Sequence, residues 1–177
     1  MIEVQTVHTS ALGPQELRDL RELLDTAFDG DFTDDDFDHA LGGMHALVRD
    51  GDALVGHGAV VLRRLVHEGA ALRTGYVEAV ATRADRRGRG IGALVMDEVE
   101  RVVRGGYELG ALGAADAAAP WYAARGWRPW DGTTSVITPD GARRTPDEDG
   151  AVHVLPVGAR LTAGGDLACD WRGGAVW

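Results

Sequence analysis

Glycines and arginines alternate in one short loop that leads directly into a helix with an apolar face. The loop reads Arg87-Gly88-Arg89-Gly90-Ile91-Gly92 and follows a segment rich in β-branched residues. The first turn of a helix leaves backbone N–H groups without intrahelical partners, and the helix dipole adds about half a positive charge there. Glycines let an anion approach the backbone without meeting a Cβ. The pattern therefore predicts a binding site for a diphosphate.

Three kinds of phosphate-binding loop contain glycines at such spacing. A Walker A loop requires a lysine, and the chain contains none. The Rossmann fingerprint is present only in the looser form Gly88-x-Gly90-x-x-Ala93, and Glu108 stands too early in the next strand-like run to be its acidic partner. The third form, Arg-x-x-Gly-x-Gly, matches segment 87–92 at every fixed position. Taken alone, this match also suits a basic, solvated turn that caps a helix.

A second motif, Tyr122-x-x-x-Gly126-Trp127, follows after one predicted helix and one predicted strand. In this order, the two motifs resemble the acyl-CoA site of the GNAT superfamily of N-acyltransferases. The resemblance implies that the loop binds the diphosphate of acetyl-CoA and that the tyrosine segment closes the coenzyme site. It also implies the GNAT fold, an α/β fold with a mixed central β-sheet that is flanked by helices and whose strands splay at the acetyl-CoA site.

Hydrophobic periodicity predicts strands and helices in an order that matches this fold. The predicted strands cover 2–8, 44–49, 53–65, 70–83, 107–112, 127–130, 133–138 and 151–157. The predicted helices cover 14–28, 34–41, 90–104 and 117–125. The longest helix is expected to end at Gly105 and Gly106, because glycine is common just after a helix. We predict one domain over 1–177, in which the weakly periodic tail 158–177 contributes to the substrate site.

The charge balance disfavours one class of partner. The 28 acidic residues outnumber the 18 arginines, which gives a formal net charge of −10. Nucleic-acid binding depends on neutralising phosphates, so no nucleic-acid partner is expected despite the Arg86–Arg89 cluster. An acidic surface instead attracts cations. Much of the acid lies in two runs, Asp29–Asp38 and Asp147–Asp149, which also suit solvated loops and helix caps.

Other sequence features concern the compartment and metals. No apolar run approaches the roughly 18 residues of a membrane-spanning helix, so no membrane partner is expected. Segment 1–10 lacks the basic and apolar regions of a signal peptide, and Cys169 is the sole cysteine. Both features favour the cytoplasm. The six histidines show no ligand spacing, so no metal is expected.

Several further stretches resemble the aminoglycoside 2′-N-acetyltransferases in particular. They are 27–33, 41–47, 75–81, 144–150 and 169–177. The last of them lies in the C-terminal tail, which separates this family from generic GNAT members. The resemblance implies acetyl transfer from acetyl-CoA to the 2′-amino group of aminoglycoside antibiotics by a homodimer. Glu148 stands where the family suggests an aspartate, and Ala175 stands where some relatives carry an acid.

Two side chains are the predicted catalytic groups. An alkylammonium of pKa about 10 must lose a proton before it attacks a thioester. Glu78, on the strand before the loop, is the predicted base, and the resemblance implies that it acts through water. Tyr122 is the predicted general acid that protonates the departing thiolate. An outward-facing strand acid and a packing tyrosine are the structural alternatives.

The resemblance also implies the binding residues. The backbone of Val80, Ala81 and Thr82 is expected to pair with the pantetheine, with the Val80 N–H donating to the thioester oxygen. The diphosphate-binding residues are Arg87, Gly88, Arg89, Gly90, Ile91 and Gly92. The substrate-binding groups are Asp31, Glu78, the backbone of Ala79 and Gly113, Glu148 and the terminal carboxylate of Trp177. Carboxylates suit a polycationic sugar because each accepts charge-assisted hydrogen bonds from ammonium groups.

Three other functions remain open. The amine could be a polyamine, another amino sugar or a small metabolite, with aminoglycoside activity and antibiotic resistance incidental. A CoA-binding regulatory module without turnover is the second, although Glu78 and Tyr122 argue against it. A nucleic-acid-binding protein that uses Arg83–Arg89 is the third, and it conflicts with the net charge of −10.

Overall fold

The computed structural model describes residues 1–177, and the chain divides into two compact units. Unit 1 comprises Met1–Val61 and Val77–Val102, and unit 2 comprises Leu62–Tyr76 and Val103–Trp177. Three elements run from one unit into the other, namely β3 (Ala53–His67), β4 (Ala70–Thr82) and α3 (Ile91–Gly106). The expected single domain over 1–177 stays a prediction.

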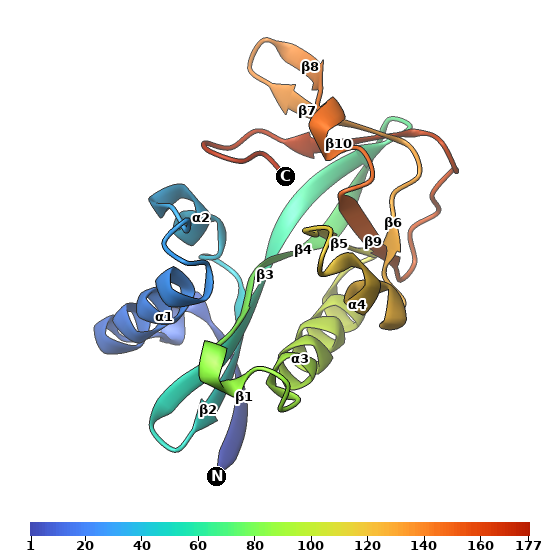
Figure 1. Cartoon of the computed structure of the whole chain (residues 1–177). Coiled ribbons are helices and arrows are strands. Elements are labelled where there is room, and N and C mark those ends of the chain that lie inside the picture. Colours follow the sequence, from blue (N-terminus) through green and yellow to red (C-terminus); the bar gives the residue numbers. More distant parts are fainter. The chain divides into compact units, whose positions relative to one another are not determined.

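Unit 1 combines antiparallel strands with two N-terminal helices (Figure 1). Its further elements are β1 (Ile2–His8), α1 (Pro14–Ala27), α2 (Asp34–His39), β2 (Met44–Asp50) and 3-10 turns at Thr9–Ala11 and Ala84–Arg86. β1 pairs antiparallel with β2 along its whole length. β2 pairs antiparallel with β3, and the register shifts after Val48.

Local sequence explains where both helices begin. α1 starts at Pro14, whose fixed φ suits the first helical turn, and the Glu16 carboxylate accepts the N–H of Gly13 at 2.9 Å. α2 starts with a capping box. The Thr33 hydroxyl accepts the N–H of Asp36 at 3.1 Å, and the Asp36 carboxylate accepts the N–H of Thr33 at 2.9 Å. The first acidic run therefore serves in part as a helix start.

The core of unit 1 lies between α1 and the sheet. Leu20, Leu23 and Leu24 of α1 are buried in one cluster with Leu47 of β2 and Leu54 of β3. Burying a leucine side chain contributes roughly 1.5–3 kcal/mol, so this cluster is a main source of stability for the unit.

The two faces of β3 in unit 1 are covered by different helices. A Cβ at Gly56 would lie 2.6 Å from the Ile91 side chain, and one at Gly58 would lie 2.8 Å from Val95. α3 therefore packs directly on the backbone of β3. Because successive side chains of a strand alternate between faces, His57 points the other way. Its partner in the register is Leu47, which belongs to the α1 cluster.

Unit 2 holds the remaining strands and one short helix (Figure 1). Its further elements are β5 (Leu109–Gly113), α4 (Ala119–Ala124), β6 (Arg128–Pro129), β7 (Thr133–Thr138), β8 (Gly141–Arg144), a 3-10 turn at Pro146–Glu148, β9 (Val152–Pro156) and β10 (Asp166–Asp170). The strand order is β6-β9-β5-β4-β3-β10-β7-β8. β4 and β5 pair in parallel, as do β10 and β7, whereas β5–β9, β3–β10 and β7–β8 are antiparallel. The predicted mixed sheet with flanking helices is confirmed.

The structure corrects some of the predicted elements. The helix stop at Gly105 and Gly106 is wrong, because α3 continues through both glycines. The sequence pattern predicts neither β8 nor β10. β8 is exposed along its whole length, so no burial pattern marks it. β10 buries only Leu167–Cys169 and depends on pairing with β3 and β7, which are distant in sequence.

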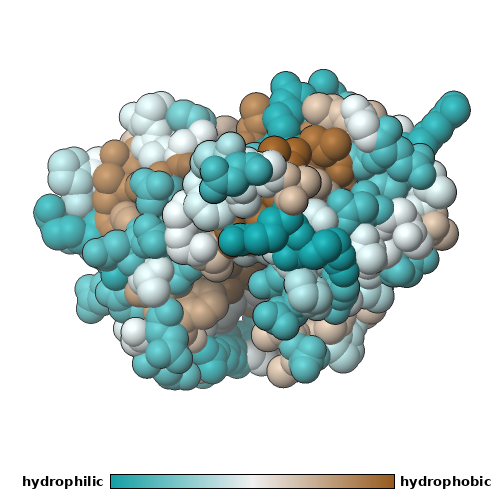
Figure 2. Space-filling view, turned by 90° about the horizontal axis from the view of Figure 1, so that it is seen from above, coloured by the Kyte–Doolittle hydropathy of each residue, from teal (hydrophilic) through white to brown (hydrophobic).

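Hydrophilic residues predominate on the face shown in Figure 2, and hydrophobic residues form separate patches there. This surface agrees with the 26% of charged residues in the chain. None of the helices combines the length and apolar character needed to cross a membrane.

Candidate functional site

The predicted diphosphate loop of unit 1 is open at its glycines. Gly88 and Gly90 have φ of +73° and +81°, which residues with a Cβ rarely adopt. A Cβ built at either glycine meets nothing within 4 Å, so strain rather than space requires glycine. The Gly90 carbonyl accepts the N–H of Leu94 at 3.1 Å, which makes Gly90 the residue just before α3.

The start of α3 suits an anion. The N–H groups of Ile91, Gly92 and Ala93 belong to the first turn, which has no intrahelical acceptors for them. No acidic side chain lies in that turn to compete with a bound anion. Open glycines, first-turn N–H groups and the helix dipole together fit the diphosphate of acetyl-CoA.

The arginines around the loop are not equivalent. Arg83 forms an ion pair with Asp85 at 2.7 Å, and Arg86 forms one with Asp50 at 3.0 Å. Two of the four arginines in segment 83–89 are therefore neutralised by ion pairs within unit 1. Arg89 is exposed, so its charge is available to a phosphate.

Two further contacts fix the edges of the loop. The Arg87 guanidinium donates to the carbonyl of Ala27, the last residue of α1, at 3.2 Å. The Arg83 N–H donates to the Val55 carbonyl of β3 at 2.9 Å. The loop is thus held to both α1 and the sheet.

The end of β4 in unit 1 carries the predicted base and the predicted pantetheine-binding residues. Glu78, Ala79 and Thr82 are half-buried, and Ala81 is buried. Ala79 has φ of +51°, a left-handed conformation that is unfavourable for a residue with a Cβ. The strand is therefore kinked between Glu78 and Val80, and this kink sets the direction of both.

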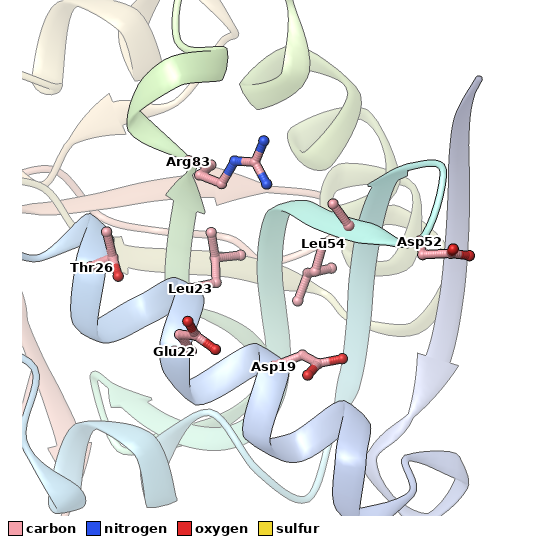
Figure 3. Close-up of a pocket in the computed structure, with 8 residues that line it drawn as sticks. Asp19, Glu22, Leu23, Thr26, Asp52, Leu54 and Arg83 are labelled. Carbon is pink, nitrogen blue, oxygen red and sulfur yellow. The ribbon is translucent and has the colours of Figure 1, made fainter.

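A cavity of about 300 Å³ in unit 1 has the wrong charge for a diphosphate. Figure 3 shows Asp19, Glu22 and Thr26 of α1 on one side and Asp52 and Arg83 on the other. Three carboxylates line the cavity. Its one guanidinium, that of Arg83, already forms an ion pair with Asp85, which is not a lining residue. We therefore assign no phosphate to this cavity.

Asp31 lies in the short connection between α1 and α2 and is exposed. Asp29 and Gly30 before it have positive φ, and its own N–H donates to the Phe28 carbonyl at 3.0 Å. Arg21 binds the connection through the Phe32 carbonyl at 3.3 Å. The carboxylate thus stands on an ordered turn that unit 1 holds from α1.

Tyr122 is buried on α4 in unit 2. Its ring lies beside Trp121 and Trp127, with centroid distances of 5.0 and 6.4 Å. Burial raises the pKa of Tyr122 to about 12. The hydroxyl therefore keeps its proton throughout the neutral range, where it can donate a hydrogen bond or act as an acid but cannot act as a phenolate base.

The second motif forms the end of α4. Gly126 has φ of +93° and its N–H donates to the Ala123 carbonyl at 3.0 Å, as expected of a glycine just after a helix. The chain then returns so that the Trp127 N–H donates to the Tyr122 carbonyl at 3.2 Å. Trp127 packs over Gly110 of β5, where a Cβ would lie 2.9 Å from the ring. The glycine and the tryptophan therefore position Tyr122.

The second acidic run contains carboxylates with different environments. Arg144 pairs with Asp149 at 2.7 Å and, together with Thr134, lowers the pKa of Asp149 to about 2. Burial raises the pKa of the half-buried Glu148, and the neighbouring Asp147 adds to the shift. Asp149 thus has a structural partner within the chain. The charged form of Glu148 is disfavoured by burial and would be stabilised by a cation that approaches it.

The C-terminal tail of unit 2 is held by side chains distant in sequence. Arg63 binds Asp170 through its carboxylate at 2.8 Å and its carbonyl at 2.9 Å. The buried Trp177 donates its indole N–H to the Thr145 hydroxyl at 2.9 Å. The Thr145 carbonyl accepts the N–H of Glu148 at 3.0 Å. One threonine therefore anchors two predicted substrate-binding residues.

Sequence reasoning gave no role to Thr145 or Arg63. Thr145 lies in the stretch 144–150 that resembles the family, whereas no motif marks Arg63. The predicted residues divide between the two units. Unit 1 holds Asp31, Glu78, Ala79, Val80, Ala81, Thr82 and the loop Arg87–Gly92. Unit 2 holds Gly113, Tyr122, Glu148 and Trp177. A Cβ at Gly113 would lie 3.8 Å from the Tyr76 hydroxyl, an ordinary contact, so space alone does not require glycine there. The roles of all these residues stay predictions.

Comparison with known proteins identifies the fold and the family. Residues 8–130 match the family model described as an acetyltransferase (GNAT) domain. A GNAT family acetyltransferase from Brucella melitensis, solved in complex with acetyl-CoA, superposes with a TM-score of 0.65 at 16% identity, covering 98% of this chain and 97% of that one. Escherichia coli ElaA superposes with a TM-score of 0.62 at 21% identity, covering 87% and 99%. The family model and the Brucella melitensis structure show that the fold is the GNAT fold.

A curated relative is much closer in sequence. The aminoglycoside 2′-N-acetyltransferase of Mycolicibacterium fortuitum is 51% identical over 175 residues, which cover 97% of this chain and 90% of the relative. The chain therefore belongs to the aminoglycoside 2′-N-acetyltransferase family of the GNAT superfamily, and it is an acetyltransferase.

Proposed function

We propose that this enzyme transfers the acetyl group of acetyl-CoA to the 2′-amino group of an aminoglycoside. The observation that carries the proposal is the 51% identity over 97% of the chain. Because the alignment covers 97% of the chain, the identity extends beyond the general acetyltransferase region 8–130 into the C-terminal part that holds Glu148.

The backbone of Gly88–Gly92 holds the diphosphate in this proposal. Support comes from the positive φ at Gly88 and Gly90 and from the lack of acids in the first turn of α3. Arg87 and Arg89 add charge-assisted hydrogen bonds. The backbone of Val80, Ala81 and Thr82 pairs with the amides of the pantetheine as an added strand would.

Glu78 acts as the base for the incoming ammonium group. A carboxylate is a weak base for an amine of pKa about 10, so removal of the proton depends on position and on a favourable electrostatic field. A water molecule relays the proton from the amine to Glu78. The kink at Ala79 sets the direction of the Glu78 side chain relative to the Val80 N–H.

The Val80 N–H donates to the thioester oxygen, where negative charge develops as the amine attacks. Loss of one such donor costs about 3 kcal/mol in other enzymes. The departing thiolate, with an ordinary pKa of about 8.5, accepts a hydrogen bond and then a proton from Tyr122. Because burial raises the pKa of Tyr122 to about 12, complete transfer of its proton to a thiolate of ordinary pKa is unfavourable, so the hydrogen bond that stabilises the charge on the sulfur comes before the proton transfer.

Carboxylates bind the remaining ammonium groups of the sugar. Asp31 in unit 1 and Glu148 in unit 2 are the proposed ligands. Burial disfavours the charged form of Glu148, and an approaching ammonium stabilises that form and so lowers the raised pKa, which favours binding. The backbone of Ala79 and Gly113 and the residue Trp177 complete the proposed set.

The test compares two substrates that differ at one group. Kanamycin B carries a 2′-amine and kanamycin A carries a hydroxyl there. Each substrate is incubated with the enzyme and acetyl-CoA and then analysed by mass spectrometry. We expect acetylation of kanamycin B alone. Equal modification of both contradicts the regiochemistry, and modification of polyamines or other amines alone moves the assignment to that class.

We also propose that the protein is a homodimer, as the family resemblance implies. Sedimentation velocity measures this directly. A monomer across the range of enzyme concentrations used in assays overturns the proposal without affecting the chemistry above.

A further inference from the structure

Two buried histidines of unit 1 form a chain of contacts that ends at the kink in β4. His45 on β2 and His57 on β3 are both fully buried. His57 Nδ1 lies 2.8 Å from the Ala79 carbonyl oxygen, and His45 Nδ1 lies 2.9 Å from His57 Nε2. The Thr9 hydroxyl lies 2.7 Å from His45 Nε2. We call Thr9, His45 and His57 the histidine relay.

The direction of every hydrogen bond in the relay follows from its last acceptor. A carbonyl oxygen only accepts, so His57 carries its proton on Nδ1 and accepts at Nε2. His45 Nδ1 then donates to His57. The Thr9 hydroxyl lies 2.7 Å from His45 Nε2 and 3.2 Å from the Gly43 carbonyl oxygen, and we assign its proton to the nearer acceptor, His45 Nε2. The Thr9 oxygen in turn accepts the N–H of Gly42 at 2.9 Å.

Both rings are neutral in this arrangement. Burial lowers the pKa of His45 to about 4 and that of His57 to about 3, which agrees with neutral rings near pH 7. A carbonyl oxygen has no proton to release and takes none up at ordinary pH. The relay therefore holds the Ala79 carbonyl in place and carries no proton to the substrate.

The backbone at Ala79, which the relay holds, is strained. Ala79 has φ of +51°, and such a conformation persists in a residue with a Cβ only where the surroundings hold it. The His57 hydrogen bond is one such restraint. Packing of the Ala79 side chain against the buried cluster of α1 is another.

We propose that His57, oriented by His45 and Thr9, is a positioning residue for acetyl transfer. By holding the Ala79 carbonyl, it keeps the kink that aims the Glu78 carboxylate and the Val80 N–H. This inference rests on the proposed function, which gives those two groups their roles.

The first experiment removes the contact and compares three variants. His57→Leu loses both hydrogen bonds, whereas His57→Gln keeps one donor and one acceptor. His67→Leu is the matched control in unit 2. His67 is also buried, with Nδ1 2.8 Å from the Asp166 carbonyl oxygen and Nε2 accepting the Thr162 N–H at 2.9 Å.

We expect His57→Leu to lower kcat for a 2′-amine about tenfold or more, as misplaced catalytic groups do, with little change in KM for acetyl-CoA. His57→Gln should stay within about threefold of wild type, and His67→Leu should lose thermal stability without this loss of kcat. Unchanged kcat in folded His57→Leu, or an equal loss in His67→Leu, overturns the proposal. If His57→Leu does not fold, His45→Leu replaces it, with about a threefold loss expected because His57 keeps its own donor.

The second experiment removes the strain that the relay opposes. Glycine adopts positive φ at little cost, so Ala79→Gly needs the His57 hydrogen bond less. We expect His57→Leu to lower kcat less in the Ala79→Gly background than in wild type, by about threefold or more in the double-mutant cycle. Strictly additive losses contradict a positioning role.

A readout without turnover separates this inference from the proposed function. Amide hydrogen exchange in the peptide that covers residues 77–82 should be faster in His57→Leu than in wild type, and His57→Gln should resemble wild type. An inactive wild type with this exchange pattern defeats the proposed function and leaves the relay intact. Equal exchange in all three proteins defeats the relay, whatever the activity.

Discussion

Unit 1 offers its predicted ligands mainly through the backbone, whereas unit 2 offers side chains. The loop Gly88–Gly92 needs only glycines with positive φ and the first turn of a helix. Glu148 and Trp177 are anchored by Thr145, more than ten residues distant from Trp177 in the chain. The difference teaches that the backbone loop is encoded locally, whereas the position of Trp177 depends on a contact between residues 32 positions apart.

The largest expected effect comes from breaking the backbone site. Gly90→Val places a β-branched residue at φ of +81°, which forces the loop to change. Losing two hydrogen bonds to a charged group, each worth about 1.5 kcal/mol, weakens acetyl-CoA binding about 100-fold. Isothermal titration with acetyl-CoA measures this loss.

The matched control is Gly141→Val in unit 2, where φ is +115° at the first residue of β8. It imposes similar backbone strain at a position outside the loop. Acetyl-CoA affinity that falls equally in both variants means that strain alone explains the result, and the backbone site is then abandoned.

Tyr122→Phe tests the side-chain chemistry of unit 2. We expect kcat to fall about 10- to 100-fold, near the low end for general acids because a thiolate leaves readily without a proton, while acetyl-CoA affinity is unchanged. Steady-state kinetics and titration separate the two quantities. Tyr107→Phe, a half-buried tyrosine of the same unit whose pKa is also raised by burial, is the control. Equal kcat for Tyr122→Phe and wild type removes Tyr122 from the chemistry.

Acid should affect the two units in different pH ranges. Burial lowers the pKa of His45 and His57 in the folded protein to about 4 and about 3, below the ordinary value near 6.5. The unfolded chain therefore binds more protons, and the free energy of unfolding falls as the pH drops below about 6.5. In unit 2, Arg144 lowers the pKa of Asp149 to about 2, so its stabilisation is present above about pH 4 and is lost toward pH 2.

Urea unfolding between pH 8 and pH 3 measures this difference. His57→Gln should reduce the slope of the free energy of unfolding against pH between about pH 6.5 and 4, because it removes one histidine whose pKa is lowered by burial. Asp149→Asn should leave that slope unchanged and act below about pH 4. If Asp149→Asn reduces the slope between about pH 6.5 and 4 and His57→Gln does not, the histidines of the relay are not buried as described.

The smallest expected effect concerns the anchor of the substrate residues. Thr145→Val removes the hydroxyl that accepts the Trp177 indole N–H and that donates to Thr134 at 2.9 Å. We expect KM for the aminoglycoside to rise about fivefold with kcat nearly constant, because one hydrogen bond contributes about 1 kcal/mol. Thr138→Val, which removes a hydroxyl in the β7–β8 turn, is the control and should leave KM unchanged. A change in kcat rather than KM argues that Thr145 serves the chemistry instead.

The sequence predicts the parts of the site that short patterns encode. The loop Arg87–Gly92, the start of α3 and the segment Tyr122–Trp127 all lie where the motifs indicate, because their geometry depends on near neighbours. The sequence pattern does not reveal the histidine relay, in which His45 on β2 contacts Thr9 in a 3-10 turn and His57 on β3. Nor does it reveal the Arg63–Asp170 pair, whose members are 107 residues apart. Contacts of this kind leave no local periodicity.

Hydrogen exchange with and without CoA tests the central claim most directly. If the backbone of Gly88–Gly92 and the first turn of α3 hold the diphosphate, CoA should slow amide exchange in the peptide that covers residues 87–94. Pantetheine, which lacks the diphosphate, should leave that peptide unchanged. Slower exchange with both ligands, or protection by CoA confined to other peptides, contradicts the account.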